Sequence, residues 1–214
     1  MIKGLIVSCQ VENMEPDTEN ALVCYYAAMA EEGGADALRI CGVENVRAVR
    51  AQTKLPIIGL TKGERSTSKA YITPSMDDAV KLSMAGADFV AVDATQRNRW
   101  PYERNDWVSF THLIGDVDSI ESAEAAAKDG RFVMMTTALA GYTEETMLTD
   151  LPAQNLAIEI QVGLGVPTIL EGGVWNLIDA DCPVDAICIG SAITRPHLIT
   201  KRFKEAICES ALQQ

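Results

Sequence analysis

The sequence has no hydrophobic run long enough to cross a membrane, and its opening, MIKGLIVSCQ, is too short and too strand-like for a signal peptide. We therefore expect a cytoplasmic protein with no membrane partner. Histidine is scarce as well: His112 begins a predicted strand and His197 lies in the last predicted helix. Two such separated histidines disfavour both a metal centre and a catalytic cysteine–histidine pair. We expect no metal ion and no other cofactor.

Closely spaced cysteine pairs are also missing, because the six cysteines are scattered, mostly within apolar stretches where a free thiol acts as a small hydrophobic group. Neither a disulfide framework nor a zinc site is indicated.

Basic residues are fewer than acidic ones, with 18 Lys and Arg against 30 Asp and Glu and a formal net charge of −12. This balance argues against a nucleic-acid partner, so any bound phosphate must be small and locally held.

Apolar runs, in contrast, recur at regular spacing. Eight of them are typical of strands, at 5–10, 37–40, 56–62, 89–95, 112–117, 132–138, 167–173 and 186–192. Helical patterns lie between them, at 19–33, 44–53, 76–86 and 120–130, and a last one follows at 195–210. Because strands that alternate with helices form parallel sheets, we predict an α/β fold, a single-domain (β/α)8 TIM barrel over residues 1–214.

Two connections between the predicted strands are short. Residues 96–111, after the fourth strand, hold at most a short helix, and residues 174–185, after the seventh, hold barely one turn. Barrel wall left exposed at these places would favour a partner subunit. With the amphipathic final segment LITKRFKEAICESAL, this predicts self-association.

Polar residues stand at nearly every predicted strand end, which in a TIM barrel is where active sites lie. The polar residues are Ser8, Gln10, Arg39, Lys62, Asp93, Thr95, Asp116, Thr136, Thr137, Glu171 and Ser191, and glycines accompany the last two at 172, 173 and 190. One polar residue at a strand end is common without any chemistry. A lysine, an arginine and three carboxylates converging on one face indicate a functional site.

The stretch PTILEGGVW ends a strand with a carboxylate and two glycines. Gly172 and Gly173, with Gly190-Ser191 after the last strand, occupy the usual phosphate site of such barrels, where bare backbone can approach an anion. Arg195 can add a fork of charged donors. We predict that these five residues bind a phosphate group. The alternative is that the glycines only form turns.

Lys62 and Glu171 are the predicted catalytic pair. Lys62 follows an apolar strand, so its amine should lie over the barrel mouth, where partial desolvation and nearby positive charge favour the neutral, basic form. Glu171 should project from the opposite side of the mouth. The alternatives are a surface ion pair of Lys62 with Glu64, or a structural pair of Lys62 with Glu171 itself. Gln96, Arg97 and Arg99 could gate the site, but a solvated loop is the simpler interpretation.

Nine blocks are spread over nearly the whole chain: KGLIVSCQ, EGGADALR, LPIIGLTK, YIT, VAVDAT, GDV, TTALAGYT, ILEGGV and GSAITRPHLITKRF. With these blocks the chain resembles the N-acetylmannosamine-6-phosphate 2-epimerases of bacterial sialic acid breakdown. The first and last are the most specific, since they are not general features of barrels. Fuller helices after strands four and seven, and a glycine pair in place of Gly190-Ser191, are the family features that this chain lacks.

The resemblance implies that the protein interconverts N-acetylmannosamine 6-phosphate and N-acetylglucosamine 6-phosphate without metal or nucleotide. It implies that Lys62 removes and returns the C2 proton while Glu171 assists at the sugar hydroxyls. It also implies a homodimer formed through the last helix. Substrate binding is expected from five further residues, Gln10, Arg39, Asp116, Thr137 and Tyr142.

Other functions remain possible from the sequence. A different phosphosugar isomerase would use similar residues, whereas a decarboxylase-like barrel would need an aspartate–lysine pair that is missing from VDAT at the end of strand four. A non-catalytic phosphosugar-binding barrel is the alternative of another class. The presence of both Lys62 and Glu171 favours the enzyme.

Overall fold

The computed structural model describes residues 1–11, 14–63, 71–96, 112–144, 146–147, 153–176 and 180–212, with only the backbone at 209–212. Glu64, Arg97 and Arg99 lie outside the described residues, as does most of the connection expected to hold a short helix after the fourth strand. Of the other short connection, the structure describes 174–176 and 180–185, and these residues lie in no α-helix.

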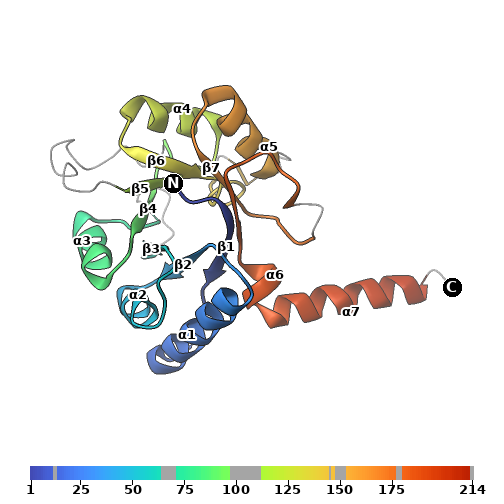
Figure 1. Ribbon diagram of the computed structural model, residues 1–214. Coiled ribbons are helices and arrows are strands. Elements are labelled where there is room, and N and C mark those ends of the chain that lie inside the picture. Colours follow the sequence, from blue (N-terminus) through green and yellow to red (C-terminus); the bar gives the residue numbers. More distant parts are fainter. Residues whose placement is uncertain are drawn as a thin grey trace.

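Eight parallel strands form a closed barrel in chain order, with β1 paired to both β2 and β8 (Figure 1). The strands are β1 (Gly4–Cys9), β2 (Ala37–Cys41), β3 (Ile57–Leu60), β4 (Phe89–Asp93), β5 (Leu113–Asp116), β6 (Phe132–Thr136), β7 (Thr168–Glu171) and β8 (Ala186–Ile189). All eight predicted strands are present, and the predicted TIM barrel is confirmed.

Helices surround this barrel in the order α1 (Pro16–Glu32), α2 (Val43–Arg50), α3 (Met76–Ala85), α4 (Ile120–Asp129), α5 (Ala153–Ile158), α6 (Ser191–Thr194) and α7 (Pro196–Leu212). Local signals set several of their ends. Ser75 and Ser119 cap α3 and α4 by accepting a backbone N–H, and Gly86 and Gly130 end the same helices in the left-handed conformation. The sequence patterns did not single out α5 or the π-helix η1 (Glu159–Leu164) that continues it.

The barrel interior follows from the period of two along each strand. One residue from every strand packs into a single apolar cluster: Ile6, Ala37, Ile58, Ala91, Ile114, Met134, Ile169 and Ala186. Side chains two positions further along the chain point to the same face. The next inward layer is therefore Ser8, Arg39, Leu60, Asp93, Asp116, Thr136, Glu171 and Cys188. The same alternation turns Val7, Leu38, Ile40 and Ile57 outward, where they pack in a cluster with residues of α1, α2 and α3.

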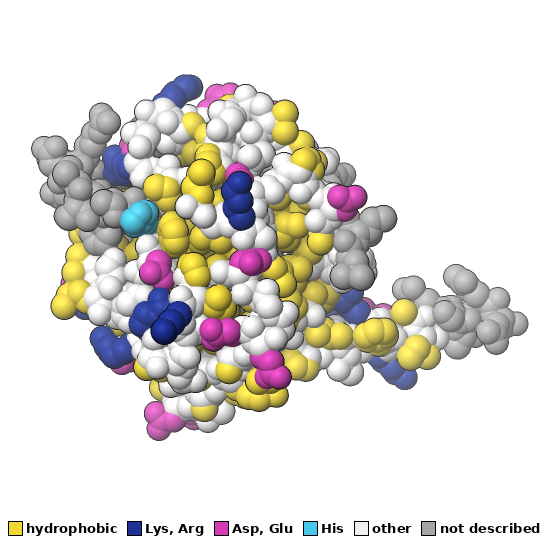
Figure 2. Space-filling view, in the orientation of Figure 1, with side chains coloured by type: hydrophobic (Ala, Val, Ile, Leu, Met, Phe, Trp, Pro, Cys, Tyr) yellow, Lys and Arg dark blue, Asp and Glu magenta, His cyan; other side chains and the backbone are white. Residues whose placement is uncertain are grey.

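Helix α7 differs from the other helices, because it leaves the barrel after α6 and projects away from it (Figure 1). Residues 201–208 are all exposed, and the large apolar side chains of Phe203 and Ile207 are 68% and 64% exposed. Figure 2 shows hydrophobic atoms along the projecting arm. No helix among the described residues is long and apolar enough to cross a membrane.

Candidate active site

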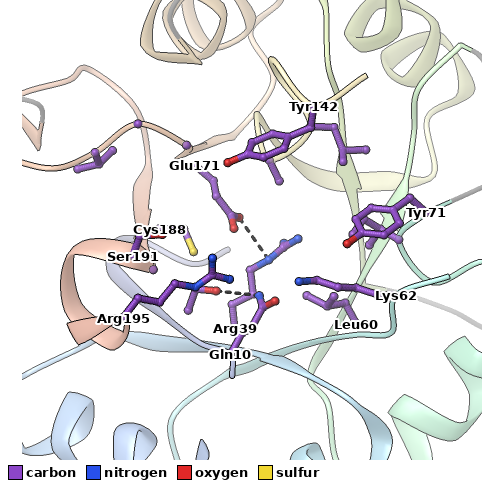
Figure 3. Close-up of a pocket in the computed structure, with 18 of the residues that line it drawn as sticks. Gln10, Arg39, Leu60, Lys62, Tyr71, Tyr142, Glu171, Cys188, Ser191 and Arg195 are labelled. Carbon is purple, nitrogen blue, oxygen red and sulfur yellow. Dashed lines mark hydrogen bonds and ion pairs between the residues drawn. The ribbon is translucent and has the colours of Figure 1, made fainter. Parts of the chain in front are cut away.

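A cavity of about 320 Å³ opens above the second inward layer, at the carboxyl ends of the strands. This layer contains one basic side chain, Arg39, and three carboxyl side chains, Asp93, Asp116 and Glu171. Arg39 and Glu171 border the cavity, together with Lys62 and Arg195 from the segments that follow the strands (Figure 3). The convergence predicted from the strand ends is therefore present.

Arg39 lies at the centre of this arrangement and is 2% exposed. Its two terminal nitrogens donate to the two carboxylate oxygens of Asp116, at 3.2 and 2.5 Å, and its Nε lies 3.3 Å from Oε2 of Glu171. Burial alone would lower the pKa of Arg39, but the charges of Asp116 and Glu171 raise it above its usual value. The guanidinium thus stays protonated and ties β2 to β5 and β7.

Asp116 is fully buried beneath Arg39. Burial raises the pKa of this carboxyl above its ordinary value, while the charge and hydrogen bonds of Arg39 oppose the shift. A buried carboxylate without such a partner would be strongly destabilising. Asp116 and Arg39 therefore depend on each other.

Glu171 is held by its backbone as well as by Arg39. The hydroxyl of Thr137 donates to the carbonyl oxygen of Glu171 at 2.8 Å and accepts from its N–H at 3.0 Å, while Thr136 donates to the carboxylate at 3.4 Å. Burial, followed by the charge of Glu171, raises the pKa of the neighbouring Cys188 well above its usual value, so this thiol stays neutral. The Glu171 side chain is 18% exposed, and its carboxylate faces the cavity (Figure 3).

Lys62 lies beyond β3, in a short antiparallel pairing with Ile72. Backbone bonds from Gly63 N–H to the Tyr71 carbonyl (2.7 Å) and from Thr73 N–H to the Thr61 carbonyl (2.9 Å) hold the two segments together. Thr73 has a φ of 47°, rare for a β-branched residue, and its hydroxyl donates to the Ala91 carbonyl at 2.6 Å. The cost of this backbone strain indicates that the surroundings fix the segment beside Lys62 in one conformation.

Gly172 and Gly173 both have positive φ values, of 107° and 73°, which side-chain-bearing residues rarely adopt. Gly190 is needed for another reason, because a Cβ there would lie 3.3 Å from the Cβ of Ser8. These glycines border the cavity together with Ser191 and Arg195. Figure 3 shows Ser191 and Arg195 on the side away from Lys62. The candidate phosphate residues thus lie together.

Two of the residues predicted to bind substrate lie elsewhere. Asp116 and Thr137 are both fully buried and do not line the cavity, since they hold Arg39 and Glu171 from below. Gln10 and Tyr142 do line it, and the amide of Gln10 donates to the Ser8 hydroxyl at 2.8 Å. Eight further lining residues were missed as site residues: Leu60, Tyr71, Ile72, Ala138, Leu139, Val174, Trp175 and Cys188. Leu60 and Cys188 could have been predicted, because the period of two along each strand turns them inward at the level of Arg39 and Glu171.

No cluster of three or more His, Cys, Asp or Glu side chains that could hold a metal ion occurs in the described part of the chain. The charged groups that line the cavity are the amine of Lys62, the guanidinium groups of Arg39 and Arg195 and the carboxylate of Glu171. Such a set can bind an anion and move a proton.

Comparison with known proteins agrees with this geometry. The model of the family described as "Putative N-acetylmannosamine-6-phosphate epimerase" matches residues 23–209. The chain belongs to this family. Relatives named "Putative N-acetylmannosamine-6-phosphate 2-epimerase" include one from Caldanaerobacter subterraneus, 34% identical (96% of this chain and 92% of the relative covered). Another, from Thermosynechococcus vestitus, is 39% identical (95% and 93% covered).

A solved structure of the N-acetylmannosamine-6-phosphate 2-epimerase from Clostridium perfringens is similar with a TM-score of 0.85 and 31% identity, covering 96% of this chain and 94% of that one. The structure of KGPDC from Streptococcus mutans is similar at 14% identity and a TM-score of 0.56, covering 89% and 88%. That second likeness shows the fold alone.

Replacing Arg39 with leucine should destabilise the fold, because Asp116 would remain buried without its cation. We expect the free energy of unfolding to fall by about 3–5 kcal/mol in urea titrations. Arg47→Leu is the control, since Arg47 pairs with Glu44 on the exposed face of α2 and should change stability by only about 0.5 kcal/mol. The double variant Arg39→Leu/Asp116→Leu should regain part of the loss. Equal stabilities of the Arg39 and Arg47 variants would contradict a central role for this ion pair.

Proposed function

We propose that this protein is a cytoplasmic epimerase that interconverts N-acetylmannosamine 6-phosphate and N-acetylglucosamine 6-phosphate by moving the proton at C2. The observation that carries the proposal is that Lys62 and Glu171 border one cavity, whose other side offers glycines, Ser191 and Arg195. Family membership and the names of the relatives support the same substrate.

The proposed reaction begins with the open-chain sugar, in which the C1 carbonyl makes the C2 proton removable. The neutral amine of Lys62 takes this proton as the C2–H bond breaks, and the electron pair moves toward the C1 oxygen as an enolate. A proton then returns to the opposite face of C2 as the enolate collapses, either from the Lys62 ammonium after the intermediate rotates or from a second proton carrier, and this gives the epimer. Glu171 orients the sugar hydroxyls, and its carboxylate is positioned for this by Arg39 and Thr137.

The other proposed site residues support this step in two ways. Gln10, Arg39 and Tyr142 line the cavity and can contact the substrate directly. Asp116 and Thr137 act through the groups they hold, Arg39 and Glu171. Gly172, Gly173, Gly190, Ser191 and Arg195 bind the phosphate, so that binding energy from this remote group holds the open form in place.

Lys62→Met should abolish epimerisation while binding of the phosphosugar persists, because methionine keeps the length of the chain but cannot accept a proton. A coupled assay with N-acetylmannosamine 6-phosphate and a calorimetric titration measure the two effects. Lys81→Met is the control, since Lys81 lies on α3 and pairs with Asp77 at the surface. Saturable binding without turnover in the unaltered protein would instead favour a non-catalytic phosphosugar-binding barrel. Full activity of Lys62→Met would rule out the proposed base.

Arg195→Ala should weaken substrate affinity much more than it slows turnover at saturation, because a remote charge contact contributes mainly to binding. Loss of one charge-assisted contact, worth about 1.5–3 kcal/mol, corresponds to a rise in KM of about 10- to 150-fold. Steady-state kinetics with Arg47→Ala as the surface control measure this. If the KM of Arg195→Ala is unchanged, Arg195 does not contact the phosphate.

We also propose that the protein is a homodimer that buries α7. This helix projects from the barrel with Phe203 and Ile207 one turn apart and largely exposed, which is costly for a monomer. A second copy of the chain is the proposed partner.

Sedimentation velocity at micromolar concentration should accordingly show a dimer or larger assembly. The variant Phe203→Glu/Ile207→Glu should shift the protein toward monomer, whereas Lys204→Gln on the same helix should not. A stable, monodisperse monomer of the unaltered protein would contradict the proposal.

A further inference from the structure

One wall of the cavity is apolar and lies beside Lys62. Leu60, Ile72 and Leu139 are buried, at 0%, 4% and 3% exposure, and form one apolar cluster against which Tyr71 packs. Tyr142 also lines the cavity. Figure 3 shows Leu60 and Tyr71 next to Lys62, whereas Ser191 and Arg195 lie on the other side of the cavity. The two sides therefore suit different parts of a ligand.

The Tyr71 side of this wall is preformed. The Tyr71 N–H donates to Oδ2 of the buried Asp93 at 2.8 Å, and the Asp93 N–H donates to the Ile72 carbonyl at 3.0 Å. Because Ile72 also pairs with Lys62, the backbones of Tyr71, Ile72 and Lys62 are parts of one hydrogen-bonded unit. The segment that carries the wall and the segment that carries Lys62 are thus held side by side by backbone bonds.

The chemistry of the substrate determines what this wall contacts. An amine that removes the C2 proton must lie against C2, and the acylamino nitrogen is bonded to that same carbon. With the phosphate held on the Arg195 side, the acyl group extends away from it, beside Lys62. Its methyl group is an apolar part of the sugar, and an apolar wall stabilises it by excluding water.

We propose that Leu60, Tyr71, Ile72, Leu139 and Tyr142 form an acyl-group subsite that selects 2-acylamino sugar phosphates with a short acyl chain. The inference rests on the proposed function and adds to it the residues that recognise the N-acyl group. Buried Ile72 and Leu139 close the subsite, so each added methylene meets packed side chains. Such pockets discriminate about 10- to 200-fold per methylene.

The test compares kcat/KM for N-acetyl-, N-propanoyl- and N-butanoylmannosamine 6-phosphate. The unaltered protein should lose at least about tenfold for each methylene added. Leu139→Ala opens the wall, and it should raise the N-butanoyl to N-acetyl ratio of kcat/KM by at least about tenfold. Val174→Ala is the matched control, because Val174 lines the cavity near Gly173 and should leave this ratio within about twofold.

Tyr71→Ala is a second variant in case Leu139→Ala does not fold, since Tyr71 is only partly buried, and it should shift the same ratio in the same direction. If the unaltered protein epimerises the N-acetyl sugar but neither variant shifts the ratio, the acyl subsite is overturned and the proposed function stands. A larger shift in Val174→Ala than in either variant overturns it as well. Failure to turn over any of the three sugars would overturn the proposed function itself.

Discussion

The ion pair between Arg39 and Asp116 is the interaction on which the rest of the site depends. It places a protonated guanidinium inside the barrel, where it offsets Asp116 directly and holds the Glu171 carboxylate at 3.3 Å. Without this cation, three carboxylates would share one layer of the barrel. The same contacts connect three strands that are not neighbours in the sheet. Stability and the position of Glu171 thus have one physical origin.

Much of this arrangement follows from local sequence signals. The spacing of the apolar runs predicted the strands, which are four to six residues long and are bounded by turns and helices. A parallel barrel then brings all the strand ends together, which is why Arg39, Lys62 and Glu171 could be assigned to one site. The glycine pair after β7 also has a local cause. Gly172 and Gly173 adopt positive φ values, which residues with a side chain rarely adopt.

Other features depend on contacts between distant segments and could not be read in this way. Asp116 and Thr137 stand at strand ends like their neighbours, but both act as supports. Asp116 accepts hydrogen bonds from Arg39 across the barrel, and Thr137 bonds to Glu171 on the adjacent strand. The pairing of Lys62 with Ile72 brings Tyr71 to the cavity wall. These two residues are ten positions apart in the sequence, and neither lies in one of the eight strands. The π-helix η1 has no periodic signal of its own.

The central claim is that a lysine moves the C2 proton, and the most direct test is epimerisation in D₂O followed by proton NMR at C2. After removing the proton, Lys62 would carry three equivalent hydrogens, two of them from solvent. The epimer should therefore lose most of its C2 proton signal, whereas the signals of hydrogens bonded to the other carbons should be unchanged. An epimer that keeps its full C2 proton signal would contradict the claim.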